Sequence, residues 1–244
     1  METKQQANED ALMEDEGRDQ VGEAEGLIIS PSDLLPGDIL LFRSLSPNVI
    51  AKQISKFTDS PYTHAAIYIG DGEIAESTPP AVKIRKLSGA DTKGVQIGVL
   101  RSQLGFSHQR AAAVREFVQQ LVVQHAAYDL KGALTFKGRH KEFHKRLLDE
   151  IAANYGKITT TDEFLKQAYF CSALVVACYM VAGVIGDTAQ VAYPPNVISP
   201  GDLHRDPTFG WVLGYIVPDG KNIPADDPLM VGTLWKDNLE ARWW

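Results

Sequence analysis

The segment that most constrains the fold is an almost wholly apolar run at positions 170–184, FCSALVVACYMVAGV. Its length and composition predict a helix, and Gly183 and Gly186 mark where this helix ends. A helix that is apolar on every side has to be surrounded by other elements, because none of its faces suits water. We therefore expect this helix to be buried inside a folded domain.

Length and composition agree with one such domain. The chain has 244 residues, of which 44% are hydrophobic, and both values are ordinary for a soluble protein with a single core. No run approaches the roughly 18 apolar residues of a membrane-spanning helix. The first residues lack the basic region and the apolar core of a signal peptide. We expect a protein made in the cytoplasm, which would need a specialised secretion system to act elsewhere.

Charge is distributed unevenly along the chain. Residues 1–26 have a net charge of −7, which equals the net charge of the whole chain. They predict a disordered acidic tail, which could bind an adaptor protein. The remaining residues sum to zero, which argues against nucleic-acid binding. We divide them into a folded domain at 27–218 and a C-terminal extension at 219–244 that packs on this domain or trails from it.

Strand and helix patterns alternate in the first half of the domain. Residues 39–43 are a short apolar run after a Pro-Gly-Asp turn, and residues 94–101 predict another strand. Residues 47–57 and 107–125 have the spacing of amphipathic helices, the second with Ser107 as its N-cap.

A β-hairpin is predicted at positions 60–77, SPYTHAAIYIGDGEIAES. Gly-Asp-Gly turns the chain between two runs of alternating residues. The two faces of the first strand are Ala65, Ile67 and Ile69 on one side and His64, Ala66 and Tyr68 on the other. His64 therefore projects beside Ala66, whose small side chain leaves room for another element.

The two cysteines differ in their position along the apolar helix. Cys171 is its second residue, where unpaired N–H groups and the helix dipole lower the pKa of a thiol and favour the nucleophilic thiolate. Cys178 lies two turns further on, where a thiol packs as a small apolar group. Their separation along the helix is about 10 Å, beyond the ~7 Å limit for a disulfide. Cys171 is therefore the candidate nucleophile.

His64 is the candidate general base for this thiol, and a third group would hold its other ring nitrogen. If residues 70–72 form a three-residue loop, His64 pairs with Thr78 and Glu76 becomes its diagonal neighbour. A two-residue loop would bring Glu73 to that face instead. Glycines on both sides of the turn favour the longer loop, so Glu76 is the expected orienting residue and Glu73 the alternative.

Five segments in this order resemble the permuted branch of the NlpC-type papain-like superfamily: LLPGDILLFR, SPYTHAAIYIGDGEIAES, VLR, AYDLKG and YFCSALVVACY. In that branch, which includes the YiiX-like proteins and the lecithin:retinol acyltransferase group, the histidine hairpin precedes the cysteine. The resemblance covers residues 34–205. It implies an α+β, circularly permuted papain-like fold, with an antiparallel sheet packed against helices that include the nucleophile helix.

The resemblance also implies roles for individual residues. Its histidine, third polar residue and nucleophile fall on His64, Glu76 and Cys171, and the thiolate would attack a carbonyl to form an acyl-enzyme. The Cys171 N–H would stabilise the oxyanion. Tyr62 is either a hydroxyl at the pocket rim or a packed aromatic. Many relatives have an acidic residue after Cys-Ser where this chain has Ala173, a difference that bears on substrate recognition.

Several functions fit this chemistry, none with a cofactor or metal, because the chain has no Gly-rich phosphate loop and no metal-ligand spacing of His or Cys. The resemblance favours an amidase or endopeptidase that cleaves peptidoglycan stem peptides. It could be an exported antibacterial effector in a target periplasm, with a secretion-system carrier and a cognate inhibitor as partners. One alternative is a hydrolase or acyltransferase for lipid or other acyl esters, with the basic segment 136–146 near an acidic head group. Another is a non-catalytic binding protein on the same fold.

Overall fold

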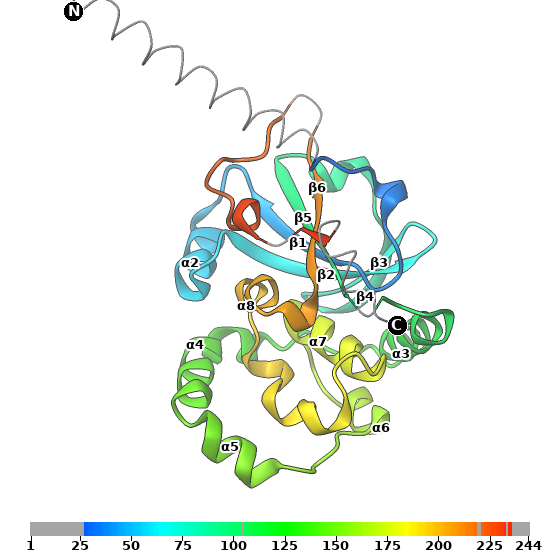
Figure 1. Ribbon diagram of the computed structural model, residues 1–244, viewed down its shortest axis with the longest axis vertical. Helices are drawn as coiled ribbons and strands as arrows, with labels where there is room; N and C mark the ends of the chain where they lie inside the picture. The colour runs from blue at the N-terminus through cyan, green and yellow to red at the C-terminus, as the bar shows by residue number, and fades with distance from the viewer. Residues whose placement is uncertain (1–26, 104, 219–220, 233, 236–244) are drawn as a thin grey trace, which may run out of the picture.

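The computed structural model describes residues 27–103, 105–218, 221–232 and 234–235, so the predicted acidic tail lies outside the described residues. These residues form an α+β fold in which a six-stranded antiparallel sheet packs against helices, consistent with a papain-like fold (Figure 1). The strand order is β4-β3-β2-β1-β5-β6. The strands are β1 (Ile39–Ser44), β2 (Tyr62–Gly70), β3 (Glu73–Thr78), β4 (Ala81–Lys86), β5 (Val95–Arg101) and β6 (Trp211–Ile216).

Most helices lie below the sheet in Figure 1, with α2 at its left and α3 at the lower right. The helices are α2 (Val49–Thr58), α3 (His108–Val123), α4 (Leu130–Lys145), α5 (Leu147–Asn154), α6 (Thr161–Leu165), α7 (Cys171–Val181) and α8 (Pro200–Arg205). The predicted strands β1 and β5 and the predicted helices α2 and α3 are confirmed. In the described ranges, no helix combines the length and the apolar character that a membrane crossing needs.

Helix α7 is the buried helix that the sequence predicts. Its residues 172–180 are all buried and pack in the main core with residues of β2, β3 and α3. The Tyr179 hydroxyl donates a hydrogen bond to the Gly37 carbonyl at 2.9 Å, so this polar group is satisfied inside the core. Gly183, with φ of 67°, follows the end of the helix, as expected for a C-terminal glycine.

The two faces of the sheet contribute to two separate cores. Ala65 and Ile67 of β2 pack in the main core with α7. Ala66 and Tyr68 belong to a smaller cluster that also contains Leu40 of β1. We expected another element beside Ala66, but α7 packs on the opposite face. The face of Ala65 and Ile67 belongs to the larger of the two clusters of buried apolar residues, and α7 is part of that cluster.

The β2–β3 hairpin has a shorter loop than predicted. Gly70 pairs with Glu73, so the loop has two residues rather than three. Both loop residues have positive φ (56° and 70°), as in the type I′ turns that suit the twist of a hairpin. A bulge after Tyr68 then inserts one residue, and Ile67 pairs with Ala75. The bulge therefore restores, away from the turn, the register that a three-residue loop would give.

A single buried carboxylate attaches the segment after β6 to the sheet. Asp227, whose side chain has no exposed surface, accepts hydrogen bonds from the hydroxyls of Tyr62 (2.6 Å) and Tyr215 (2.9 Å). It also accepts from Gln96 (3.1 Å) and from Arg43 (2.9 Å). A buried charge is tolerated only when it is paired and hydrogen-bonded in this way. This carboxylate therefore connects β1, β2, β5 and β6 to the C-terminal segment.

Replacing Asp227 by alanine should lower the free energy of unfolding by about 3–5 kcal/mol, because Arg43 would remain buried without this partner. Asp226 provides a matched control, since it also pairs with Arg43 (2.7 Å) but its side chain is 79% exposed. Asp226→Ala should cost less than about 1 kcal/mol. Urea denaturation of the two variants measures the difference. Equal losses of stability would contradict the role given to Asp227.

Candidate active site

Cys171 is the first residue of α7, one position closer to the helix start than predicted. Phe170 precedes it as the N-cap, in an extended conformation and with no side-chain hydrogen bond to the helix. The first-turn N–H groups therefore lack a side-chain cap. Ser172 is buried and its hydroxyl donates to the Ile198 carbonyl at 2.8 Å, which holds the first turn in place. The thiol thus lies at the positive end of the helix dipole.

His64 lies where strands β2 and β3 stop pairing with each other. The pairing of these strands runs from the turn to Ile67 and Ala75, and His64 pairs with Phe42 of β1 on its other side. The His64 and Phe42 rings have centroids 5.1 Å apart. The His64 ring lies close enough to the Cys171 thiol for each group to shift the pKa of the other toward its charged form. The opening between the strands thus allows the start of α7 to reach the histidine.

Glu76 of β3 contacts His64 from the other side of this opening. The Nε2 of His64 donates to Oε2 of Glu76 at 2.8 Å, which leaves Nδ1 for the thiol. The Glu76 side chain is only 3% exposed, and its Oε1 is 2.6 Å from Arg85 Nε and 3.1 Å from Lys83 Nζ. The structure therefore brings together Cys171, His64 and Glu76, the three residues proposed from the sequence.

Electrostatics at the site favour an imidazolium–thiolate pair. Burial opposes charge on His64, but hydrogen bonds with Cys171 and Glu76 raise the pKa of His64 to about 9. Burial also opposes the thiolate, yet His64 and the backbone N–H groups of Ala65 and Ser172 outweigh it and lower the pKa of Cys171. Burial would likewise raise the pKa of Glu76, but His64 and its other cationic partners lower it. All three shifts therefore favour the charged forms: imidazolium at His64, thiolate at Cys171 and carboxylate at Glu76.

Hydrogen-bond donors surround the sulfur. The N–H groups of Ala65 and Ser172 bond to the thiol, and the N–H of Cys171 belongs to the first turn of α7. Tyr128 lines the same pocket as Cys171. Burial and the charge of Cys171 raise the pKa of Tyr128 to about 12, so its hydroxyl stays protonated and can donate. Sequence reasoning missed Tyr128 as a site residue, although it lies in the AYDLKG segment.

Tyr62, the other tyrosine considered, is a packed aromatic and not part of the pocket rim. It has no exposed surface, and its hydroxyl donates to Asp227 at 2.6 Å. Its ring lies edge-on to His204, with centroids 5.6 Å apart. The hydroxyl is therefore already bonded to a structural partner and has no role at the sulfur.

An apolar pocket of about 240 Å³ opens beside Cys171. Its walls come from α2, from α4 and from the residue before α7: Ile54, Phe57, Ala133, Leu134, Phe136 and Phe170. The sequence identified residues 136–146 only as a basic segment, so neither helix α4 nor the apolar side chains that it contributes to the pocket were predicted. The pocket is suited to an apolar part of a substrate whose carbonyl reaches the sulfur.

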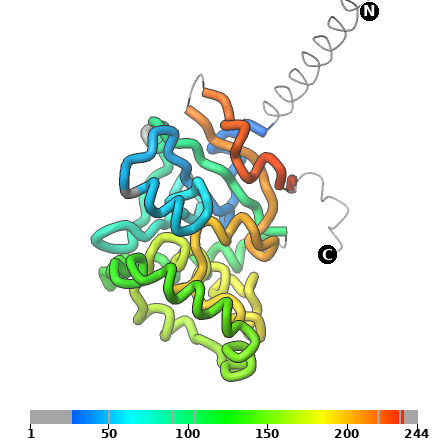
Figure 2. The backbone as a smooth tube through the Cα atoms, turned by 90° about the vertical axis from the view of Figure 1, so that its left-hand side faces the viewer, coloured from blue at the N-terminus to red at the C-terminus, as the bar shows by residue number. Residues whose placement is uncertain are grey.

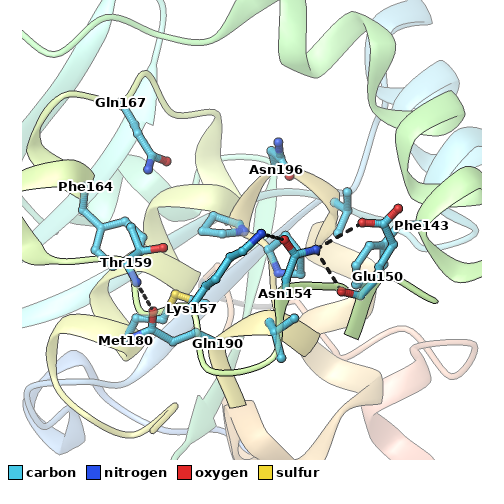
Figure 3. A pocket seen from close by; sticks show the side chains of 14 residues that line it. Phe143, Glu150, Asn154, Lys157, Thr159, Phe164, Gln167, Met180, Gln190 and Asn196 are labelled. Carbon is cyan, nitrogen blue, oxygen red and sulfur yellow. Dashed lines mark hydrogen bonds between the residues drawn. The ribbon is translucent and has the colours of Figure 1, made fainter. Parts of the chain in front are cut away.

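A second cavity, of about 410 Å³, lies around Met180 near the other end of α7 (Figure 3). Its walls carry polar groups that are already bonded: Lys157 donates to Asn154 (2.9 Å), and Gln190 accepts from the Thr159 N–H (2.9 Å). None of the three site residues lines this cavity. Across the described ranges, no three His, Cys, Asp or Glu side chains gather as a metal site would require.

Comparison with known proteins gives a distant relative. A scan of the chain against models of known families finds no match. An alignment 187 positions long, which covers 72% of this chain, shows 27% identity to a protein of Escherichia coli (strain K12) named probable lipoprotein peptidase YaeF. The chain spans 64% of that relative's length.

Replacing Glu76 by glutamine should lower turnover on the order of 100-fold while the fold is retained. The variant loses the charge that raises the pKa of His64, so the alkaline limb of the pH profile should move to lower pH. Hydrolysis of p-nitrophenyl acetate across pH, beside a melting curve, measures both effects. Glu73→Gln is the control, since Glu73 binds Arg115 (2.8 Å). If Glu73→Gln is impaired and Glu76→Gln is normal, Glu73 is the orienting residue.

Proposed function

We propose that this protein is a cysteine hydrolase that transfers an acyl group from its substrate first to Cys171 and then to water. The observation that carries this proposal is the interacting series Cys171–His64–Glu76 at the start of a buried helix, in which His64 bonds to Glu76 and lowers the pKa of Cys171. The proposal includes the permuted papain-like branch, because the hairpin of His64 precedes the nucleophile helix in the chain. A binding protein without activity would not need a nucleophile with a lowered pKa.

The proposed reaction has two steps. The Cys171 thiolate attacks the substrate carbonyl carbon, and the resulting oxyanion accepts hydrogen bonds from N–H groups around the sulfur. The His64 imidazolium then gives its proton to the leaving nitrogen or oxygen, and a thioester to Cys171 remains. In the second step, neutral His64 takes a proton from water, which attacks the thioester and releases the acid. Glu76 stabilises the imidazolium each time it forms.

The first candidate substrate is a peptide amide, specifically a peptidoglycan stem peptide. Support comes from the resemblance to NlpC-type enzymes and from the relative, which is itself named a probable peptidase. Peptidoglycan lies in the periplasm, so we propose this compartment of a target cell as the site of action. An exported effector would need a secretion-system carrier to reach it, and a cognate inhibitor would protect the producing cell.

The second candidate substrate is an acyl ester of a lipid, and the pocket favours it. The side chains beside Cys171 are largely aliphatic and aromatic, whereas a stem peptide would bring charged groups that are costly to bury there. An acyl chain would fill this pocket without that cost. The reaction steps are the same, with an alcohol rather than an amine as the leaving group.

Incubation with purified peptidoglycan and, separately, with phospholipid vesicles distinguishes the two substrates when the products are read by mass spectrometry. We expect products from one of them, with an acyl adduct on Cys171. Cys171→Ala should abolish the products, because the nucleophile is lost. Cys178→Ala should retain most activity, because Cys178 is fully buried in the core. Intact turnover by folded Cys171→Ala, or no turnover of either substrate by the wild type, would contradict the proposal.

A further inference from the structure

Two helices beside the candidate site expose large apolar side chains. Phe57 on α2 is 51% exposed, and Leu130 and Leu134 on α4 are 59% and 78% exposed. Val49 at the start of α2 is 71% exposed. Such residues are unremarkable when scattered singly, but a group of them around one opening marks an interaction surface.

Two of these residues, one from each helix, lie at the pocket that contains Cys171. Phe57 and Leu134 both line the pocket, and Lys137 Nζ lies 5.2 Å from the centre of the Phe57 ring, so α2 and α4 meet across the mouth. Both helices lie on the left of Figure 1, the side that faces the viewer in Figure 2. The α2–α4 surface is the exposed side of α4 together with Phe57 of α2, and it comprises Phe57, Leu130, Lys131, Leu134, Lys137 and Lys141.

The same surface is strongly basic, although residues 27–244 have no net charge. The two lysines of α2, Lys52 and Lys56, line a neighbouring pocket together with Arg43 and Asp226. Helix α4 contains five Lys or Arg residues and one acid, a net charge of +4. Among the described ion pairs, none includes a lysine of the α2–α4 surface. The nearby Asp129 caps α4 through the Gly132 N–H (2.7 Å) and does not pair with them.

We infer that the α2–α4 surface docks on an anionic lipid bilayer, with the apolar side chains in the interface and the lysines at the head groups. Exposed aliphatic side chains among lysines match the boundary between head groups and acyl chains, whereas nucleic acid offers its phosphates to lysines and little that suits leucine. Each lysine near an anionic membrane contributes about fivefold to the partition coefficient. In this orientation the mouth of the Cys171 pocket faces the membrane.

Membrane docking goes beyond the proposed function, and a binding measurement on a catalytically inactive variant can test it. The full-length Cys171→Ala protein is mixed with vesicles of phosphatidylcholine and phosphatidylglycerol, or of phosphatidylcholine alone, and the bound fraction is measured by sedimentation. We expect binding to the anionic vesicles that weakens with added salt. Leu134→Asp should lower the partition coefficient about tenfold or more. Lys137→Gln and Lys141→Gln should each lower it about fivefold.

Matched controls lie on other elements. Val123→Asp replaces a 78% exposed residue of α3, and Lys166→Gln removes an exposed lysine after α6; neither should change binding by more than about twofold. The inference is wrong if anionic vesicles bind no better than neutral ones, or if the controls lose as much binding. It is also wrong if the protein sediments with peptidoglycan through these lysines but not with vesicles. If the wild-type protein binds anionic vesicles but hydrolyses neither substrate, membrane docking stands and the proposed function is wrong.

Discussion

The burial of α7 is the constraint on which the candidate site depends. Because residues 172–180 are enclosed, the helix cannot rotate or slide without opening the core, and Cys171 is held at one point relative to the sheet. At that point β2 and β3 stop pairing, so His64 of β2 can meet the thiol while Glu76 of β3 bonds to the other nitrogen of its ring. The core therefore aligns three groups whose mutual interactions favour the thiolate.

Two buried carboxylates have separate tasks in this arrangement. Glu76 has cationic partners in Arg85 and Lys83 besides His64, so its charge persists where it holds the imidazole. Asp227 is satisfied by tyrosine, glutamine and arginine donors and attaches the C-terminal segment to the sheet. Each would be costly to bury without its partners. The first orients a reacting group, whereas the second holds the strands of the scaffold together.

The sequence predicts structure well where the contacts join residues close together in the chain, and poorly where they join residues far apart in the chain. Periodicity predicts α2, α3 and α7, and the three site residues follow from one hairpin and one helix start. The partner of Tyr62 is Asp227, 165 positions away, and no local pattern reveals it. Helix α4 was missed because Gly132, Gly138 and its many charges obscure the helical period. The apolar pocket was missed with it, since α4 supplies one wall.

The most direct test of the account is the ionisation of Cys171, followed by thiolate absorbance near 240 nm as a function of pH. Comparison with Cys171→Ser isolates the signal of this thiol. In the wild type we expect the thiolate to persist well below the ordinary cysteine pKa of about 8.5, because imidazolium at His64 stabilises it. In His64→Ala the midpoint should rise toward or above that value. An unchanged midpoint in folded His64→Ala would contradict the ion pair at the centre of the account.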